Sequence, residues 1–152
     1  MNGIARYFML LGVISVVLGM AWGIQMAASG DHSMAAAHAH LNLLGWVTCA
    51  IFAFYYHAVP TAAEGPLPLV HLLIATAGLI TIVPGIAMAL RHDGETLAKI
   101  GSLLSLLSML IFAVVVLRGR GGARDGLTSV SPLAWAPFRS RRRPDRRGYD
   151  KS

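Results

Sequence analysis

Charged residues are scarce in this sequence. They make up 13% of its 152 residues, whereas hydrophobic residues make up 55%. A soluble domain carries about 25% charged residues, so the composition argues against a soluble protein. The apolar residues also occur in long runs, and no run has an Asp, Glu or Lys in its interior. The sequence therefore indicates an integral membrane protein.

Cysteine is nearly missing as well. The single Cys49 excludes an intrachain disulfide, and we expect it to pack as a small apolar residue. We find no internal repeat, and the short alternating segments of a membrane β-barrel do not occur. These absences leave a helical membrane domain as the expected fold class.

Four apolar segments are long enough to cross a bilayer, which takes about 20 residues per helix. We expect these membrane helices at residues 4–28, 37–59, 68–90 and 96–117. The first segment is longer than a typical signal-peptide core and no A-x-A site follows it, so we expect it to be retained. The sequence thus predicts an all-α, four-helix membrane domain over residues 1–118.

The positive charges predict the orientation of these helices. Arg6 and the ten Lys and Arg residues from Arg118 to Lys151 account for 11 of 13, and four spans put both termini on one side. That side should be cytoplasmic, in a multi-pass protein of the bacterial inner membrane. Residues 119–152 are rich in Arg, Gly, Ser and Pro, so we expect a disordered tail that attracts anionic lipids, with no nucleic-acid partner.

Glycines form a stripe on the first helix. Gly12, Gly19 and Gly23 fall on one face, and the last two form a GxxxG pair. The favoured interpretation is close packing against another helix; the alternative is a flat ligand that lies on the glycine face. A similar pattern of small residues occurs in the fourth segment.

The stretch AHAHLNLLGW (37–46) opens the second helix with two histidines. His38 and His40 differ by about 200° around a helix, so their side chains should face opposite sides. Histidines that chelate one ion from one helix lie four residues apart instead. The pair therefore predicts two different pockets, one on each side of the helix.

Haem is the cofactor that such pockets favour. A neutral imidazole is the usual axial ligand of haem iron, and haem needs only one or two protein ligands in an apolar slot. Asn42, one turn after His38, could orient that ring, and Trp46 could pack on a porphyrin or fill a helix interface. Arg91 and His92, at the same membrane depth, could meet the propionates.

Other interpretations of the histidines stay open. Each could lie idle in the headgroup region. His57 and His71 flank the inner loop and could bind a second haem or a metal, but we favour simple polar contacts at the interface. His40 and His57 lie about 25 Å apart along a helix, so they cannot share one metal. His32 is expected in a solvated loop.

With YYHAVP (55–60) at the end of the same helix, AHAHLNLLGW resembles the catalytic subunit of heme-copper oxidases and the related nitric oxide reductases. That subunit has 12 membrane helices in three four-helix arcs, with histidine ligands near the outer ends of the second helix of each arc. An H-x-H pair in one arc points to two haems. The resemblance implies that residues 1–118 form one such arc, with His38 and His40 as axial ligands of haem iron.

The departures from that family limit what the resemblance implies. The chain has no adjacent histidine pair for copper, no cross-linked Tyr-His pattern and no mid-membrane Glu or Lys, which argues against oxygen or nitric oxide reduction and against proton pumping. Three copies would supply twelve helices, so the resemblance implies a homotrimer in which His38 of one subunit faces His40 of its neighbour across a haem b.

Three functions follow from this sequence. The first is a haem b protein for electron transfer or for redox or gas sensing, with a quinone or cytochrome as redox partner. The second is an assembly or structural factor without a cofactor, which binds other membrane subunits through small-residue faces. The third, a metal or solute transporter, is disfavoured because the spans lack carboxylates and inverted repeats.

Overall fold

The computed structural model describes residues 1 and 3–127, with side chains described as far as Gly119. The described residues form helices joined by short loops and include no strand. Four spans are long and apolar enough to cross a membrane: Ile4–Ser29, Ala35–Ala58, Leu67–Leu90 and Thr96–Gly119. The predicted all-α membrane fold with four transmembrane helices is therefore confirmed.

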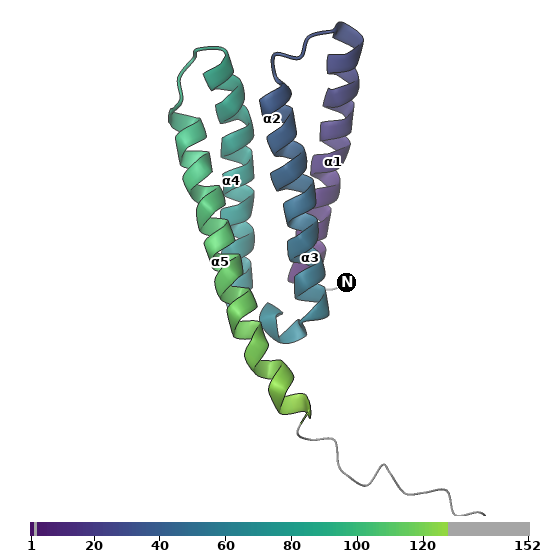
Figure 1. Cartoon of the computed structure of the whole chain (residues 1–152), viewed down its shortest axis with the longest axis vertical. Helices are drawn as coiled ribbons and strands as arrows, with labels where there is room; N and C mark the ends of the chain where they lie inside the picture. The colour runs from purple at the N-terminus through teal and green to yellow at the C-terminus, as the bar shows by residue number, and fades with distance from the viewer. Residues whose placement is uncertain (2, 128–152) are drawn as a thin grey trace, which may run out of the picture.

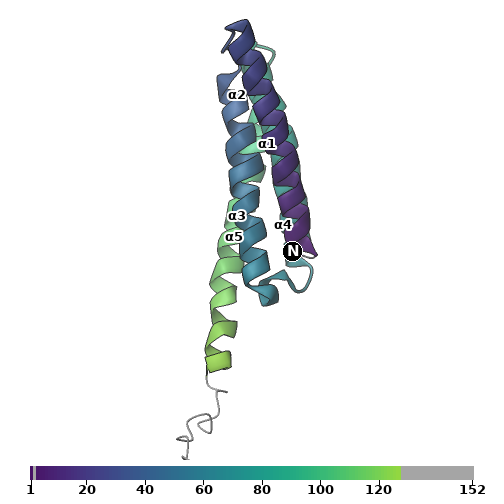
Figure 2. The same cartoon turned by 90° about the vertical axis from the view of Figure 1, so that its right-hand side faces the viewer.

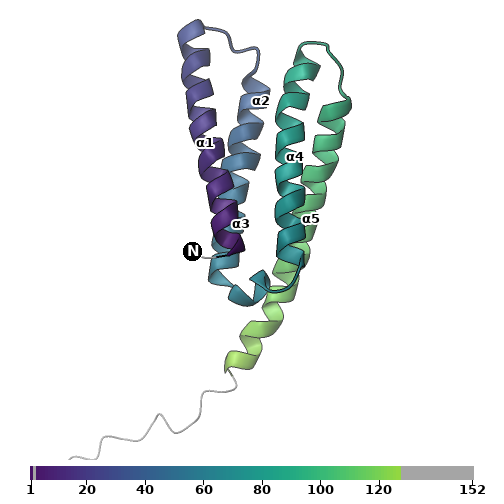
Figure 3. The ribbon, with the colours of Figure 1, turned by 180° about the vertical axis from the view of Figure 1, so that it is seen from behind.

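The four spans form two antiparallel hairpins (Figures 1 and 3). α1 (Ile4–Ser29) pairs with the second span, and α4 (Leu67–Leu90) pairs with α5 (Thr96–Leu127). The loops 30–34 and 91–95 lie at one end of the bundle, which we call the histidine end. The N-terminus, the loop 59–66 and the last turns of α5 lie at the opposite end, the tail end (Figure 2).

The second span consists of three helical segments. α2 (Ala35–His40) leads into a π-helix, η1 (Leu41–Thr48), and α3 (Cys49–Ala58) completes the span. Side chains follow the wider π spacing: Thr48 Oγ1 donates to the Leu43 carbonyl at 2.9 Å, five residues earlier. π-Segments are rare and occur frequently at functional sites. This one follows directly on the histidine pair.

α5 extends beyond the end that the sequence predicts at residue 117. The helix continues to Leu127, although residues 118–127 include four glycines, which are poor helix formers. The predicted disordered tail over 119–152 thus begins with helical residues. Its remaining part, 128–152, lies outside the described residues.

Close backbone contacts hold α4 and α5 together. A Cβ added at Gly101 of α5 would lie 2.5 Å from the Ile82 backbone of α4, and one added at Gly78 would lie 3.2 Å from the Ser105 nitrogen. The small residues of the fourth span therefore pack inside the chain. Cys49 is buried in the core and forms no disulfide, as the sequence predicts.

Candidate functional site

His38 lies against α1 at the histidine end. Its ring sits over Gly23, where an added Cβ would be 3.2 Å from the imidazole Cε1. Trp22 meets the same ring edge-on, with centroids 6.2 Å apart and an interplanar angle of 89°. The imidazole is therefore half-buried between the first two spans.

The glycine stripe of α1 receives the side chains that the sequence singled out on the second span. A Cβ at Gly19 would collide with the Asn42 amide, and one at Gly12 would lie 3.2 Å from the Trp46 ring. Gly12 and Gly19 thus pack against the second span, as the helix-packing interpretation predicts, whereas Gly23 meets only the His38 ring. Trp46 fills this helix interface.

Asn42 holds the backbone of His38 more firmly than its ring. The amide Nδ2 donates to the His38 carbonyl at 2.9 Å, whereas the two ring nitrogens lie 3.4 and 3.5 Å away. Both residues face an open groove of about 410 Å³ beside α1. The groove is lined by Met20, Gly23, Ile24, Ala27, His38 and Asn42.

His40 adopts a different arrangement from His38. Its Nδ1 lies 2.8 Å from the Ala36 carbonyl on its own helix. A carbonyl can only accept, so Nδ1 carries the proton and the lone pair is on Nε2. Both residues lie on α2, and helix geometry separates their positions by about 200° around its axis. In a neutral His40 this hydrogen bond leaves Nε2 free to act as an acceptor or as a metal ligand.

Arg91 and His92 lie at the same end of the bundle, where they terminate α4. The N–H of Asp93 donates to the Met88 carbonyl at 3.0 Å, and the N–H of His92 donates to the Ala89 carbonyl at 3.1 Å. This is a Schellman motif, with His92 in the left-handed region at φ 63° where glycine is usual. Both side chains are exposed, and no hydrogen bond among the described residues joins them to His38 or His40.

The first loop carries a third histidine of this end. His32 is exposed, and its Nδ1 lies 3.1 Å from the Gly30 carbonyl, which agrees with the prediction of a loop residue. Next to it, the backbone N–H of Ser33 donates to Asp31 at 2.9 Å and lowers the pKa of that carboxyl. The loop is therefore ordered by its own short-range hydrogen bonds.

The structure places His71 where the sequence does not predict it. Its side chain is 0% exposed, in the core near the tail end. Nδ1 shares a hydrogen bond of 2.9 Å with the Tyr56 hydroxyl, and Nε2 has no partner. Four aromatic rings from the other three spans enclose the imidazole, with centroids 4.4 to 5.9 Å away: Phe8, Phe52, Tyr56 and Phe112.

His57 does not join His71 in a site. The His57 side chain is exposed at the end of α3, whereas His71 is sealed inside the aromatic cluster. The expected interfacial contacts therefore fit His57 and not His71. Within the part of the chain that the structure describes, no three His, Cys, Asp or Glu side chains gather as a metal-binding group.

The chain was compared with known proteins. No family model, no curated protein and no solved structure matches it.

Proposed function

We propose that this chain is a haem b-binding protein of the bacterial inner membrane that transfers electrons or senses redox state or a diatomic gas. The observation that carries the proposal is the hydrogen bond from His40 Nδ1 to the Ala36 carbonyl. Metal-bound histidines are commonly oriented by such a bond, which leaves Nε2 available as a ligand. Neutral imidazole is the usual axial ligand of haem iron.

His38 supports a second ligand position on the other side of α2. It borders the groove beside α1, whose remaining lining is apolar apart from Asn42. This groove is open, so a second surface is needed to enclose a bound cofactor. A neighbouring copy would provide that surface, and we propose a homotrimer in which His38 of one subunit and His40 of the next hold each haem. Arg91 and His92 would offer cationic partners for propionates.

The bound haem would supply one-electron redox chemistry. With histidine in both axial positions the iron has no open site, which favours electron transfer with a quinone or cytochrome partner; a single histidine would leave a position for a gas. The positive charges favour a cytoplasmic tail end, and with that orientation the histidines would lie at the periplasmic surface.

The test is an absorption spectrum of the full-length protein, purified in mild detergent from cells supplied with haem, with a pyridine-hemochrome assay. We expect a haem b spectrum in the wild type. His38→Ala and His40→Ala should each lower haem content about tenfold or more, because loss of a supporting hydrogen bond alone costs 10- to 100-fold in metal affinity. A shift on addition of carbon monoxide would indicate sensing, and no shift would indicate electron transfer.

His57→Ala is the matched control, because this histidine is exposed on the same span at the far end. Its haem content should equal that of the wild type. A colourless wild-type protein would contradict the proposal and favour the assembly factor instead. The small-residue faces on which that alternative depends are used inside the chain, however, since Gly12 and Gly19 face the second span and Gly101 faces α4.

A further inference from the structure

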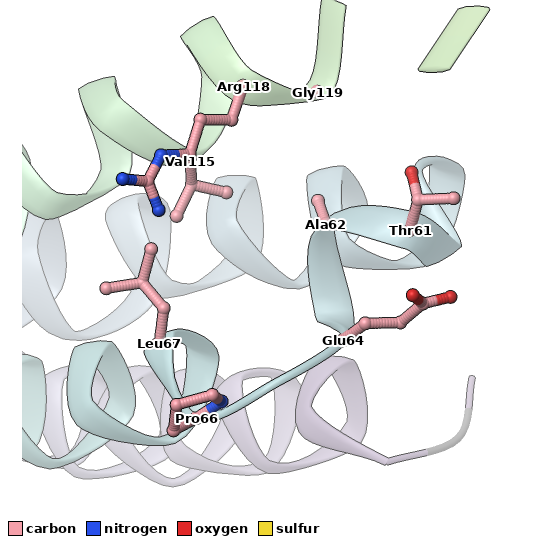
Figure 4. A pocket seen from close by; sticks show the side chains of 8 residues that line it. All are labelled: Thr61, Ala62, Glu64, Pro66, Leu67, Val115, Arg118 and Gly119. Carbon is pink, nitrogen blue, oxygen red and sulfur yellow. The ribbon is translucent and has the colours of Figure 1, made fainter. Parts of the chain in front are cut away.

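A pocket at the tail end lies apart from the histidine pair. It has a volume of about 370 Å³ and opens between α5 on one side and the loop 59–66 with the start of α4 on the other. Figure 4 shows the side chains that line it: Thr61, Ala62, Glu64, Pro66, Leu67, Val115, Arg118 and Gly119. Both walls come from segments that adjoin the ends of membrane spans.

The depth of the pocket is that of lipid headgroups. The span of α4 begins at Leu67 and the apolar span of α5 ends at Gly119, and both residues line the pocket. The polar headgroup region begins where such apolar spans end. Phospholipids of the tail-end leaflet are therefore the molecules that this pocket meets at the highest concentration.

The pocket is lined by one cationic side chain, one anionic side chain and several apolar side chains. Arg118 and Glu64 are both exposed and belong to opposite walls, and they form no ion pair with each other. Figure 4 shows Val115 and Leu67 beside the Arg118 side chain, with Glu64 on the other side of the pocket. Guanidinium groups bind phosphate through paired hydrogen bonds, and a carboxylate accepts hydrogen bonds from a primary ammonium group. The pocket thus offers partners for both charges of a zwitterion.

We propose that this pocket binds the headgroup of an amine-bearing phospholipid, of the phosphatidylethanolamine type. Arg118 binds the phosphate, Glu64 accepts from the ammonium group, and the apolar glycerol and acyl portions lie against Leu67 and Val115. A choline headgroup has no N–H to donate to Glu64. An anionic phosphatidylglycerol places a net negative charge beside the same carboxylate, so both should bind less tightly.

The experiment is a native mass-spectrometric titration of full-length protein, stripped of lipid by detergent exchange, with each of three lipids: phosphatidylethanolamine, phosphatidylcholine and phosphatidylglycerol. We expect one phosphatidylethanolamine per chain, bound about tenfold more tightly than phosphatidylcholine, as one charge-assisted hydrogen bond would provide. Glu64→Gln should abolish this preference. Arg118→Gln should lower the affinity for all three lipids, because each of them carries the phosphate. Neither result depends on haem.

Two controls separate the pocket from general charge. Arg6→Gln removes a cation of the same end that lies outside this pocket and should change nothing. Ala62→Trp fills the pocket without changing any charge and should abolish the preference; it also tests the proposal if a charge variant fails to fold. The basic tail attracts anionic lipid equally in all variants, so differences between variants report the pocket.

Three results would overturn the proposal. The first is equal affinity of the wild type for phosphatidylethanolamine and phosphatidylcholine. The second is a preference that survives in both Glu64→Gln and Ala62→Trp. The third is displacement of the lipid by soluble phosphoethanolamine at the same concentration, which would indicate a site for a soluble metabolite.

Discussion

His71 is a polar side chain in a place that normally excludes polar groups. One ring nitrogen has the Tyr56 hydroxyl as a partner and the other has none, although the side chain is fully buried. A buried polar atom without a partner costs about 1–3 kcal/mol. The hydrogen bond to Tyr56 is therefore what makes burial of this imidazole tolerable.

We predict that Tyr56→Phe lowers the free energy of unfolding by about 1–3 kcal/mol, because it leaves both nitrogens of His71 without a partner. The double variant Tyr56→Phe/His71→Phe should recover most of this loss, since rings of similar size fill the aromatic cluster and no buried polar atom remains. Thermal unfolding in detergent, followed by circular dichroism, measures both. If the loss of stability in the double variant equals the sum of the losses in the two single variants, the two residues are not coupled.

The sequence could predict the angle between His38 and His40 but not the place of His71. The angle between His38 and His40 depends only on the rotation per residue of the helix that carries both. The place of His71 depends on how α3 and α4 pack, and the prolines of the loop 59–66 leave that undetermined. One signal was nevertheless present: aromatic residues occur near the tail end of the first, second and fourth spans, at the depth of His71.

The helices themselves were the easiest part to predict, because length and hydropathy define a membrane span without tertiary information. The predicted 37–59 compares with an observed span of Ala35–Ala58. The sequence does not predict the π-segment η1, which contains a close contact between spans: a Cβ at Gly45 would lie 2.5 Å from the Ser15 Cβ. Such a contact has no local sequence pattern.

The close approach of the helix backbones predicts different losses of stability when different glycines are replaced by alanine. Gly101→Ala should lower the free energy of unfolding by about 1–3 kcal/mol, because the new methyl group meets the Ile82 backbone, which cannot move aside. Gly12→Ala is the matched control, since its methyl group meets mainly the Trp46 side chain, which can shift. We therefore expect a smaller loss for Gly12→Ala in the same unfolding measurement. Equal losses would contradict the packing of α5 on α4.

At the scale of the whole molecule, two hairpins leave wide apolar faces on the outside. Many large hydrophobic side chains of every span are more than one-third exposed, as expected for surfaces that contact lipid or other subunits. The groove beside His38 belongs to this outer surface. A second copy on that surface would complete the proposed haem site.

The proposed trimer predicts complementation between variants. His38→Ala and His40→Ala, each expressed alone, should bind little haem. Expressed together, they should recover about a quarter of the wild-type haem, because random mixing leaves one intact His38–His40 interface in each mixed trimer. Haem absorbance per chain measures the recovery, and native mass spectrometry should show trimers. No recovery, or a fully loaded monomer, would contradict sharing between subunits.

η1 also sets the azimuth of the histidine end. A π-turn contains one residue more than an α-turn, so residues 41–48 wound as regular α-helix, with none removed, would turn further by about the rotation of one residue. Everything above that point would then swing by about 100° relative to α3. The His38 ring would no longer lie over Gly23, and the His40 side chain would point in a different direction. The π-segment thus determines the direction in which both imidazoles project from the second span.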